Sequence, residues 1–236
     1  MNRRLPIAAR EEASGPLEVT KRPMTAVLVG PIQQENLALQ YLAGSVRRAG
    51  HRAKVVAYSY RRDLDAAVAA TLAEKPDLVG LGIAFQNNIE DYLAFMNLLA
   101  ERGFRGHLTC GGHVPTFCYQ ELLRDVPGLD SVVRHDGEST LVEMLDCLSA
   151  GRAVKDIAGL VWREGESVVQ GPVRHAANDL DSLPIPARSE LPYTVGGLTV
   201  DFLITARGCV GECNYCSIAA YTTEQQKRYR LRKPEA

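Results

Sequence analysis

The sequence predicts an α/β protein whose first domain is a doubly wound parallel sheet of five strands, and three observations support this. Between Met24 and Ala150, short apolar runs alternate with segments whose apolar residues recur at helical spacing. Leu78–Ala84 is apolar throughout, which is typical of a parallel strand buried on both faces. The connections between runs and helical segments are short, which favours repeated βα units.

Each apolar run is bounded by residues that end strands or begin turns. The first, Thr25–Gly30, is followed by Pro31, and Gly-Pro is a turn dipeptide. The second run precedes the helical segment that ends before Pro76. The five strands are expected at Thr25–Gly30, Ala53–Ala57, Leu78–Ala84, His107–Cys110 and Ser131–Arg134.

The helical segments carry their own start and stop residues. In the first, Leu39, Leu42 and Val46 recur at helical spacing, and Gly50 ends the segment. Pro115 suits the first turn of the fourth helix. The helices are expected at Glu35–Ala49, Asp63–Glu74, Ile89–Glu101 and Pro115–Leu123, with a fifth that Ser139 caps.

Sheets of this class bind ligands at the carboxyl ends of their strands. The loops to consider are therefore those that follow the strands, at Gly30–Glu35, Ala84–Asn88, Gly111–Thr116 and His135–Ser139. Glycines at strand ends allow a large planar ligand to approach the backbone closely. Helix N-termini beside them suit amide and phosphate groups.

Composition excludes several classes of function. Hydrophobic residues make up 46% of the chain and charged residues 23%, and the net charge is −1, so we expect neither a nucleic-acid nor a membrane partner. No apolar run approaches the roughly 18 residues of a membrane span. Residues 1–23 mix basic and acidic residues without apolar periodicity, which predicts a disordered tail and a cytoplasmic protein.

The character of the chain changes after the first domain, which we assign to residues 24–150. Residues 151–199 should form a hairpin, from Ala158–Trp162 and Ser167–Gln170, and then a linker with four prolines between Pro172 and Pro192. Residues 200–236 read as the start of a second domain. Its first element should be a buried strand, Val200–Thr205, leading directly into a group of cysteines.

Three of the six cysteines, Cys209, Cys213 and Cys216, lie within eight residues of one another. In a reducing compartment such a group indicates metal binding. Three thiolates in a compact loop can hold three corners of a 4Fe–4S cluster and leave the fourth iron open. Gly208 and Gly211 allow the loop to wind tightly. A structural zinc site is the alternative, although such sites usually pair two CxxC motifs and the chain has no second pair.

The CxxxCxxC spacing, with Arg207-Gly208 before the first cysteine and Tyr215 before the last, resembles radical S-adenosylmethionine (radical SAM) enzymes. The resemblance implies that the three cysteines ligate a 4Fe–4S cluster whose open iron binds S-adenosylmethionine. It also implies that Tyr215 lies against the adenine. Val210 stands where many relatives have proline.

The upstream residues resemble the cobalamin-binding subfamily of these enzymes, and the likeness runs from about Thr25 to the C-terminus. The motifs that carry it are Cys110–Thr116, similar to a GGxHxT loop, Asp136–Ser139, similar to a GEGE loop, Gly159–Arg163 and Leu180–Pro184. The resemblance implies a flavodoxin- or Rossmann-like domain of the cobalamin-binding type, followed by the beginning of a (β/α) barrel. It implies that cobalamin contacts Gly111, Gly112, His113, Thr116, Gly137 and Glu138.

The subfamily's pattern leaves the cobalt ligand open. The DxHxxG motif, which supplies a histidine to cobalt in many cobalamin proteins, is missing after the first strand, where Gly30–Glu35 stands. His113 is a candidate ligand, but we favour a structural histidine that makes backbone hydrogen bonds. The other four histidines have no paired spacing and read as structural or exposed.

A rival resemblance is to the radical methylthiotransferases, which hold a second cluster on three N-terminal cysteines and act on tRNA or protein. Cys110, Cys118 and Cys147 could supply those ligands. We favour small buried side chains instead, since Cys118 and Cys147 fall within predicted helices. The basic run from Lys227 to Lys233 could contact RNA, but it also resembles the family's approach to the next barrel helix.

The resemblance implies a cobalamin-dependent radical SAM methyltransferase acting on an unactivated carbon of a small molecule, with an external electron donor such as flavodoxin or ferredoxin. The alternatives are a cobalamin-dependent cyclase or rearrangement enzyme, a methylthiotransferase, and a non-catalytic corrinoid carrier. Since 37 residues follow Thr199 and a barrel needs on the order of 200, we expect a chain too short to act alone. We also expect the segment after about Thr199 to be poorly ordered or to dock loosely.

Overall fold

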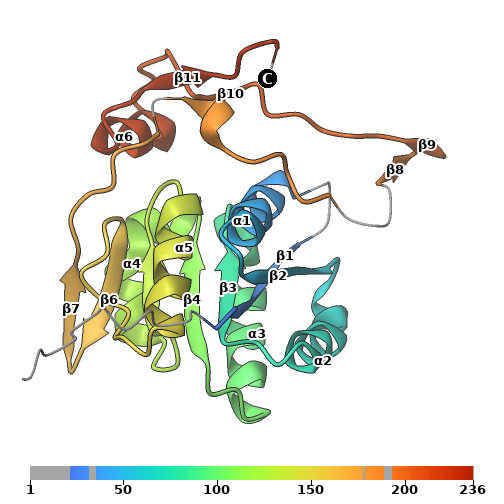
Figure 1. Ribbon diagram of the computed structural model, residues 1–236, viewed down its shortest axis with the longest axis vertical. Helices are drawn as coiled ribbons and strands as arrows, with labels where there is room; N and C mark the ends of the chain where they lie inside the picture. Colours follow the sequence, from blue (N-terminus) through green and yellow to red (C-terminus); the bar gives the residue numbers. More distant parts are fainter. Residues whose placement is uncertain (1–21, 32–35, 178, 189–192, 236) are drawn as a thin grey trace, which may run out of the picture.

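The computed structural model describes residues 22–31, 36–177, 179–188 and 193–235. Its centre is a seven-stranded sheet in the order β2-β1-β3-β4-β5-β6-β7, with helices on both faces (Figure 1). The first five strands are parallel: β1 (Thr25–Pro31), β2 (Arg52–Tyr58), β3 (Leu78–Gly82), β4 (His107–Gly111) and β5 (Ser131–Val133). The order 2-1-3-4-5 is the flavodoxin-like form of the doubly wound sheet. The predicted fold class is confirmed.

Five helices cover the sheet, and each follows a strand. They are α1 (Leu37–Arg48), α2 (Leu64–Ala73), α3 (Ile89–Glu101), α4 (His113–Asp125) and α5 (Glu138–Ser149). The short 3₁₀ helices Arg61–Asp63 and Gln86–Asn88 precede α2 and α3. The fifth helix is not capped as predicted, because Gly137 occupies the N-cap position and Ser139 lies inside the helix.

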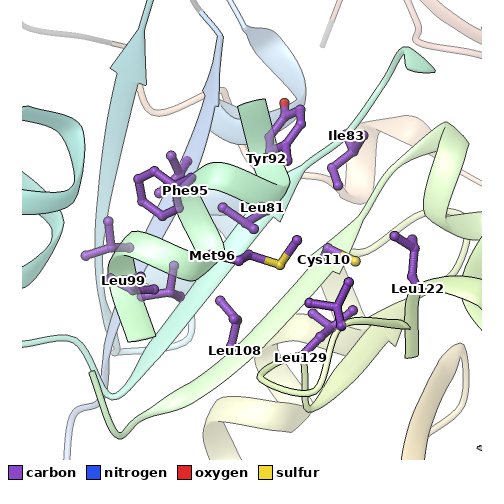
Figure 2. Packing of buried hydrophobic residues seen from close by; sticks show 14 of the residues in the cluster. Leu81, Ile83, Tyr92, Phe95, Met96, Leu99, Leu108, Cys110, Leu122 and Leu129 are labelled. Atoms are coloured by element: carbon purple, nitrogen blue, oxygen red, sulfur yellow. The ribbon is translucent and has the colours of Figure 1, made fainter. Parts of the chain in front are cut away.

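The alternation of side chains along β1 divides the core between the two faces of the sheet. Val27 and Val29 pack with residues of α2, α3 and α4, whereas Ala26 and Leu28 pack with α1 and α5. Figure 2 shows the first of these clusters, in which side chains of α3 lie over β3 and β4. Since both faces are buried, every position of β1 up to Gly30 is buried.

The predicted hairpin is present and extends the same sheet. Strand β6 (Leu160–Glu164) pairs antiparallel with β5, and β7 (Ser167–Gln170) pairs antiparallel with β6. The chain enters β6 through Gly159, which has a φ of +78°. The edge strand of the parallel sheet is therefore covered by the hairpin.

The remaining elements are short: the 3₁₀ helix Leu180–Ser182, β8 (Thr194–Val195), β9 (Leu198–Thr199), β10 (Ala206–Gly208), α6 (Ser217–Glu224) and β11 (Tyr229–Leu231). The segment before β8 runs across α1, where the amide of Ala187 donates to the carbonyl of Gln40 at 3.0 Å. In Figure 1 the segment from β10 to β11 lies above α1, α4 and α5.

The predicted strand Val200–Thr205 is wrong. Residues 200–205 form no strand; β10 begins at Ala206 and pairs antiparallel with β11. Leu203 is 72% exposed. An apolar run becomes a buried strand only when neighbouring strands satisfy its backbone. Among the described strands none pairs with residues 200–205, although the carbonyl of Thr205 accepts from the amide of Arg232 at 2.8 Å.

Most of the predicted disordered tail, residues 1–21, lies outside the described residues. Arg22, within the predicted tail, is held in place, because its guanidinium is 2.7 Å from Asp77 and its carbonyl accepts from the hydroxyl of Ser149. The first described contacts of the chain therefore precede the domain start expected at residue 24.

Candidate functional site

A cavity of about 250 Å³ opens at the carboxyl ends of β3, β4 and β5. Gly80 and Gly82 of β3 and Thr109 and Gly111 of β4 are among the residues that line it. Gly80 adds no side chain to the sheet here, whereas at Gly82 the side chain of Leu39 from α1 occupies the space, 2.7 Å from where a Cβ atom would lie. The other lining residues are Leu28, Asn36, Ala38, Leu39, Leu42, Leu81, Ala84, Cys110, Gly112, Val133, His135, Asp136, Gly137, Glu138, Leu141, Ile204, Arg207 and Tyr221.

Four predicted residues, Gly111, Gly112, Gly137 and Glu138, meet at this cavity. Gly112 has a φ of +105°, and a Cβ atom there would lie 2.7 Å from the carbonyl oxygen of Ile83. The backbone conformation and this internal contact already require glycine at position 112, whether or not a ligand binds.

Thr116 lies outside the cavity and joins two of its loops. Its hydroxyl donates to the carbonyl of Gly112 at 2.8 Å and accepts from the amide of His135 at 2.9 Å. Its side chain is fully buried. Thr116 therefore fixes the loop after β4 against the loop after β5.

His113 also points away from the cavity, toward α6. Its ring stacks on that of Tyr221 with the centroids 5.2 Å apart, and its Nε2 lies 2.5 Å from the hydroxyl of Ser217. Burial lowers the pKa of His113. These contacts are with side chains of α6 and not, as we expected, with the loop backbone.

His135 reaches the cavity, although its sequence pattern predicts only a structural or exposed histidine. It is 5% exposed and has a φ of +62°, which is unusual for a residue other than glycine. Its Nε2 is 3.0 Å from Glu224, and its ring meets the edge of Tyr221. Burial lowers the pKa of His135, and the hydrogen bond to Glu224 partly offsets that effect.

The loop after β5 supplies two carboxylates to the β10–β11 ribbon. Arg207 lies 2.6 Å from Glu138 and 3.5 Å from Asp136, and Arg230 lies 2.7 Å from Asp136. Burial would lower the pKa of Arg207, but Glu138 and Asp136 outweigh it, so the guanidinium stays charged. On α6, Glu224 pairs with Arg134 at 2.5 Å. The segment after Thr199, for which we expected poor order or loose docking, thus forms several ion pairs with the α/β domain.

Sequence reasoning missed Asp136, Arg207 and Tyr221 as residues that line the cavity. The acidic pair in the loop after β5 and the arginine before the first cysteine were visible as motif residues. Their pairing was not, because 69 positions separate Arg207 from Glu138.

The cysteine loop begins at the end of β10. The amide of Cys209 donates to the carbonyl of Arg228 at 2.8 Å, and a Cβ atom at Gly208 would lie 2.0 Å from that same oxygen. The amide of Gly211 lies 3.3 Å from the Sγ of Cys209. A Cβ atom at Gly211 would lie 3.4 Å from the sulfur of Cys209 and 3.8 Å from that of Cys213, so the two sulfurs flank Gly211.

Cys216 occupies the N-cap position of α6, and its amide donates to the carbonyl of Cys213 at 3.0 Å. Within the described ranges, no three His, Cys, Asp or Glu side chains gather closely enough to hold one metal ion. Thiolates around one zinc ion would lie roughly 4 Å apart, since each Zn–S bond is about 2.3 Å. A 4Fe–4S cluster instead takes each thiolate at a separate corner, which suits three cysteines spread along a loop. Tyr215, beside Cys216, is 93% exposed.

The other three cysteines cannot form one ligand set, which removes the basis for the methylthiotransferase alternative. Cys110 lies in the core on the α3 face of the sheet, and Cys147 in the core on the α1 face. Burial raises the pKa of the Cys110 thiol. Cys118 is exposed at a kink in α4, so its expected burial is wrong, whereas that of Cys147 is confirmed.

Comparison with known proteins agrees with this geometry. The family model of the B12 binding domain matches residues 25–145. An uncharacterized methyltransferase of Pyrococcus horikoshii is 33% identical over 186 residues, covering 77% of this chain and 40% of the relative. The hopanoid C-3 methylase of Methylococcus capsulatus is 27% identical over 201 residues, covering 79% of this chain and 36% of the relative. The chain thus spans about two fifths of the length of these relatives.

Among solved structures, the radical S-adenosylmethionine methyltransferase TsrM from Kitasatospora setae, with cobalamin and a [4Fe–4S] cluster bound, superimposes with a TM-score of 0.68. The match covers 90% of this chain and 44% of TsrM at 20% identity, which establishes a shared fold.

Fold and comparisons together define a B12-binding type of α/β domain, followed by a segment that carries three closely spaced cysteines. The chain belongs to the B12-binding domain family. None of the helices in the described residues has the length and apolar character that a membrane crossing requires.

Proposed function

We propose that the chain is the N-terminal part of a cobalamin-dependent radical SAM methyltransferase that acts on an unactivated carbon of a small molecule. One observation carries this: the strand that leads into the cysteine loop contributes to the lining of the cavity. Asp136, Gly137 and Glu138 line the cavity, and so does Arg207, which lies two residues before Cys209. A reaction that uses both a corrinoid and a cluster needs the two groups side by side. The names of the relatives, a methyltransferase and a methylase, support methyl transfer.

The cavity suits one part of cobalamin. At about 250 Å³ and with mostly aliphatic and glycine lining, it is far too small for a whole corrinoid but suits a flat aromatic base. The rest of the corrinoid would need space outside the cavity. Gly111, Gly112, Gly137 and Glu138 would contact the cofactor, whereas His113 and Thr116 would support the loops that do. His113, engaged with Ser217 and Tyr221, would not ligate cobalt.

Cys209, Cys213 and Cys216 would hold the 4Fe–4S cluster, and the exposed ring of Tyr215 would lie against the adenine of S-adenosylmethionine. When bound, these groups supply a 5′-deoxyadenosyl radical and a transferable methyl group. The electron would come from a donor such as flavodoxin or ferredoxin. We propose a cytoplasmic location, since a thiolate-bound cluster needs cysteines that stay reduced.

Anaerobic reconstitution followed by analysis of bound iron, sulfide and corrinoid tests the proposal. We expect about four irons per chain, as a 4Fe–4S cluster requires, together with one corrinoid. Replacing Cys209, Cys213 and Cys216 by alanine should abolish iron binding and leave corrinoid binding intact. The matched control is the pair Cys118→Ala and Cys147→Ala, which should keep the iron.

Other results of the iron, sulfide and corrinoid analysis would support a different function or contradict the proposal. Corrinoid without iron in the wild-type chain would indicate a carrier, and iron without corrinoid would argue against the whole assignment. Equal loss of iron in the Cys118→Ala and Cys147→Ala controls would contradict the ligand set. A cyclase or rearrangement enzyme would bind both groups, so isotopically labelled methyl transfer to product, measured in the complete protein, separates it from a methyltransferase.

A further inference from the structure

Arg207 has a position that the cluster-ligand role of the cysteines does not explain. It lies in β10, and its side chain is 16% exposed. Beyond it, Gly208 has a φ of +89° and packs against the carbonyl of Arg228, which also accepts from the amide of Cys209. The start of the cysteine loop, two positions from Arg207, is therefore held against the residue that precedes β11.

The guanidinium of Arg207 forms its ion pairs with the α/β domain. Its guanidinium lies 2.6 Å from Glu138, whose side chain is 8% exposed, and 3.5 Å from Asp136. It also lies over the ring of Tyr41, at 5.3 Å from the ring centroid. Glu138 and Asp136 belong to the loop that lines the cavity. A planar guanidinium can bind two carboxylates at once in a fixed orientation, which an ammonium cannot.

The α6 helix has its own attachments, so Arg207 is not needed to keep the segment on the domain. Glu224 pairs with Arg134 and His135, and Tyr221 stacks on His113. These contacts lie on α6, after the last cysteine. Arg207 lies before the first cysteine, so the loop between them is fixed at both ends.

We propose that Arg207 is a positioning residue, which holds the cysteine loop at one separation from the cavity by bridging Asp136 and Glu138. This role rests on the proposed function, because it concerns the distance between the cluster and the corrinoid. Without the bridge, both groups still bind. The β10–β11 pair is then held to the loop after β5 through Arg230, 2.7 Å from Asp136, and the strand before Cys209 gains freedom to move relative to the cavity.

The test is a pulsed electron paramagnetic resonance measurement on the full 236-residue chain, reconstituted with cluster and corrinoid. With the cluster reduced and cobalt as Co(II), both centres are paramagnetic, and their dipolar coupling reports their separation. The wild type should show one narrow distance. Arg207→Ala should bind the same iron and corrinoid but show a broad distribution, and Arg207→Lys should be intermediate. Glu138→Gln, which keeps the shape and removes the charge, should also broaden it.

Arg174→Ala is the matched control. Arg174 is 19% exposed and is also paired to a glutamate of α5, at 2.7 Å from Glu143, but it does not touch the cysteine segment. Replacing Arg174 by alanine should leave the distribution of cluster-to-cobalt distances narrow. If Arg207→Ala does not fold by circular dichroism, Glu138→Gln and Arg207→Lys decide the question.

The outcomes are separable. A wild-type distance that is unchanged in all three variants, with both groups bound, would overturn the positioning role and leave the proposed function intact. A broad distance distribution in Arg174→Ala as well would show that any lost ion pair loosens the protein, and this would also overturn the positioning role of Arg207. A wild-type chain that binds no cluster or no corrinoid would end the proposed function, and this role with it.

Discussion

At the scale of single residues, the glycines around the cavity differ in how strictly the structure requires glycine at their positions. Gly112 combines a positive φ with a backbone neighbour, the Ile83 carbonyl, that cannot move aside. Gly137 has an ordinary φ, and a Cβ atom there would meet only methyl groups of Leu42 and Val133 at 3.3 Å. The first is fixed by the fold, whereas the second has flexible neighbours.

Gly112→Ala should therefore lower the free energy of unfolding, since strained backbone costs on the order of 1–3 kcal/mol and a steric contact is added. Gly50→Ala is the control, because Gly50 has a φ of +86° and nothing within 4 Å of its Cβ position. Urea denaturation gives the free energy of unfolding of both variants, and the difference between them is the cost of the steric contact with Ile83. A loss in Gly112→Ala no larger than in Gly50→Ala would contradict the close approach to Ile83.

At the scale of elements, β3 determines the shape of the cavity. The strand reads LVGLG, and both of its glycines line the cavity. At Gly80 a Cβ atom would lie 3.1 Å from a terminal methyl of Leu28, a side chain that can adjust. Larger side chains at this position would therefore project into the space without breaking the strand, and valine favours strand geometry.

Gly80→Val should weaken corrinoid binding by about tenfold, which corresponds to roughly 1.4 kcal/mol. Isothermal titration calorimetry with cobalamin measures the change, and circular dichroism should show the same secondary structure. Gly128→Ala, with open space around the added atom, is the control and should bind as the wild type does. Equal affinity in Gly80→Val would place the ligand outside this cavity.

At the scale of the whole molecule, the described structure consists of the α/β domain with the cysteine segment on its carboxyl edge. The contact between them contains His135, with Glu224, Arg134 and Asp136 around it. Burial lowers the pKa of His135 below its usual 6.5, so the folded protein prefers the neutral ring. The unfolded chain then binds more protons than the folded chain as the pH falls below 6.5.

The stability associated with His135 should accordingly be complete above pH 6.5 and be lost as the pH falls toward the lowered pKa of the folded state. His135→Asn removes the titration and tolerates the left-handed backbone. Urea midpoints measured across this range should depend less on pH in the variant. An identical pH dependence would show that His107 or His113, whose pKa values burial also lowers, dominates instead.

The sequence by itself determined the five βα repeats, the hairpin and the cysteine spacing, because each depends on residues that are near one another along the chain. It also pointed to Gly111, Gly112, Gly137 and Glu138, since the fold class places strand ends at one edge. The tertiary structure decided the rest. Only there does Glu138 pair with Arg207 and His113 stack on Tyr221. Thr116 lies outside the cavity, and residues 200–205 form no strand. Those outcomes depend on contacts between residues that are far apart in sequence, which no local pattern specifies.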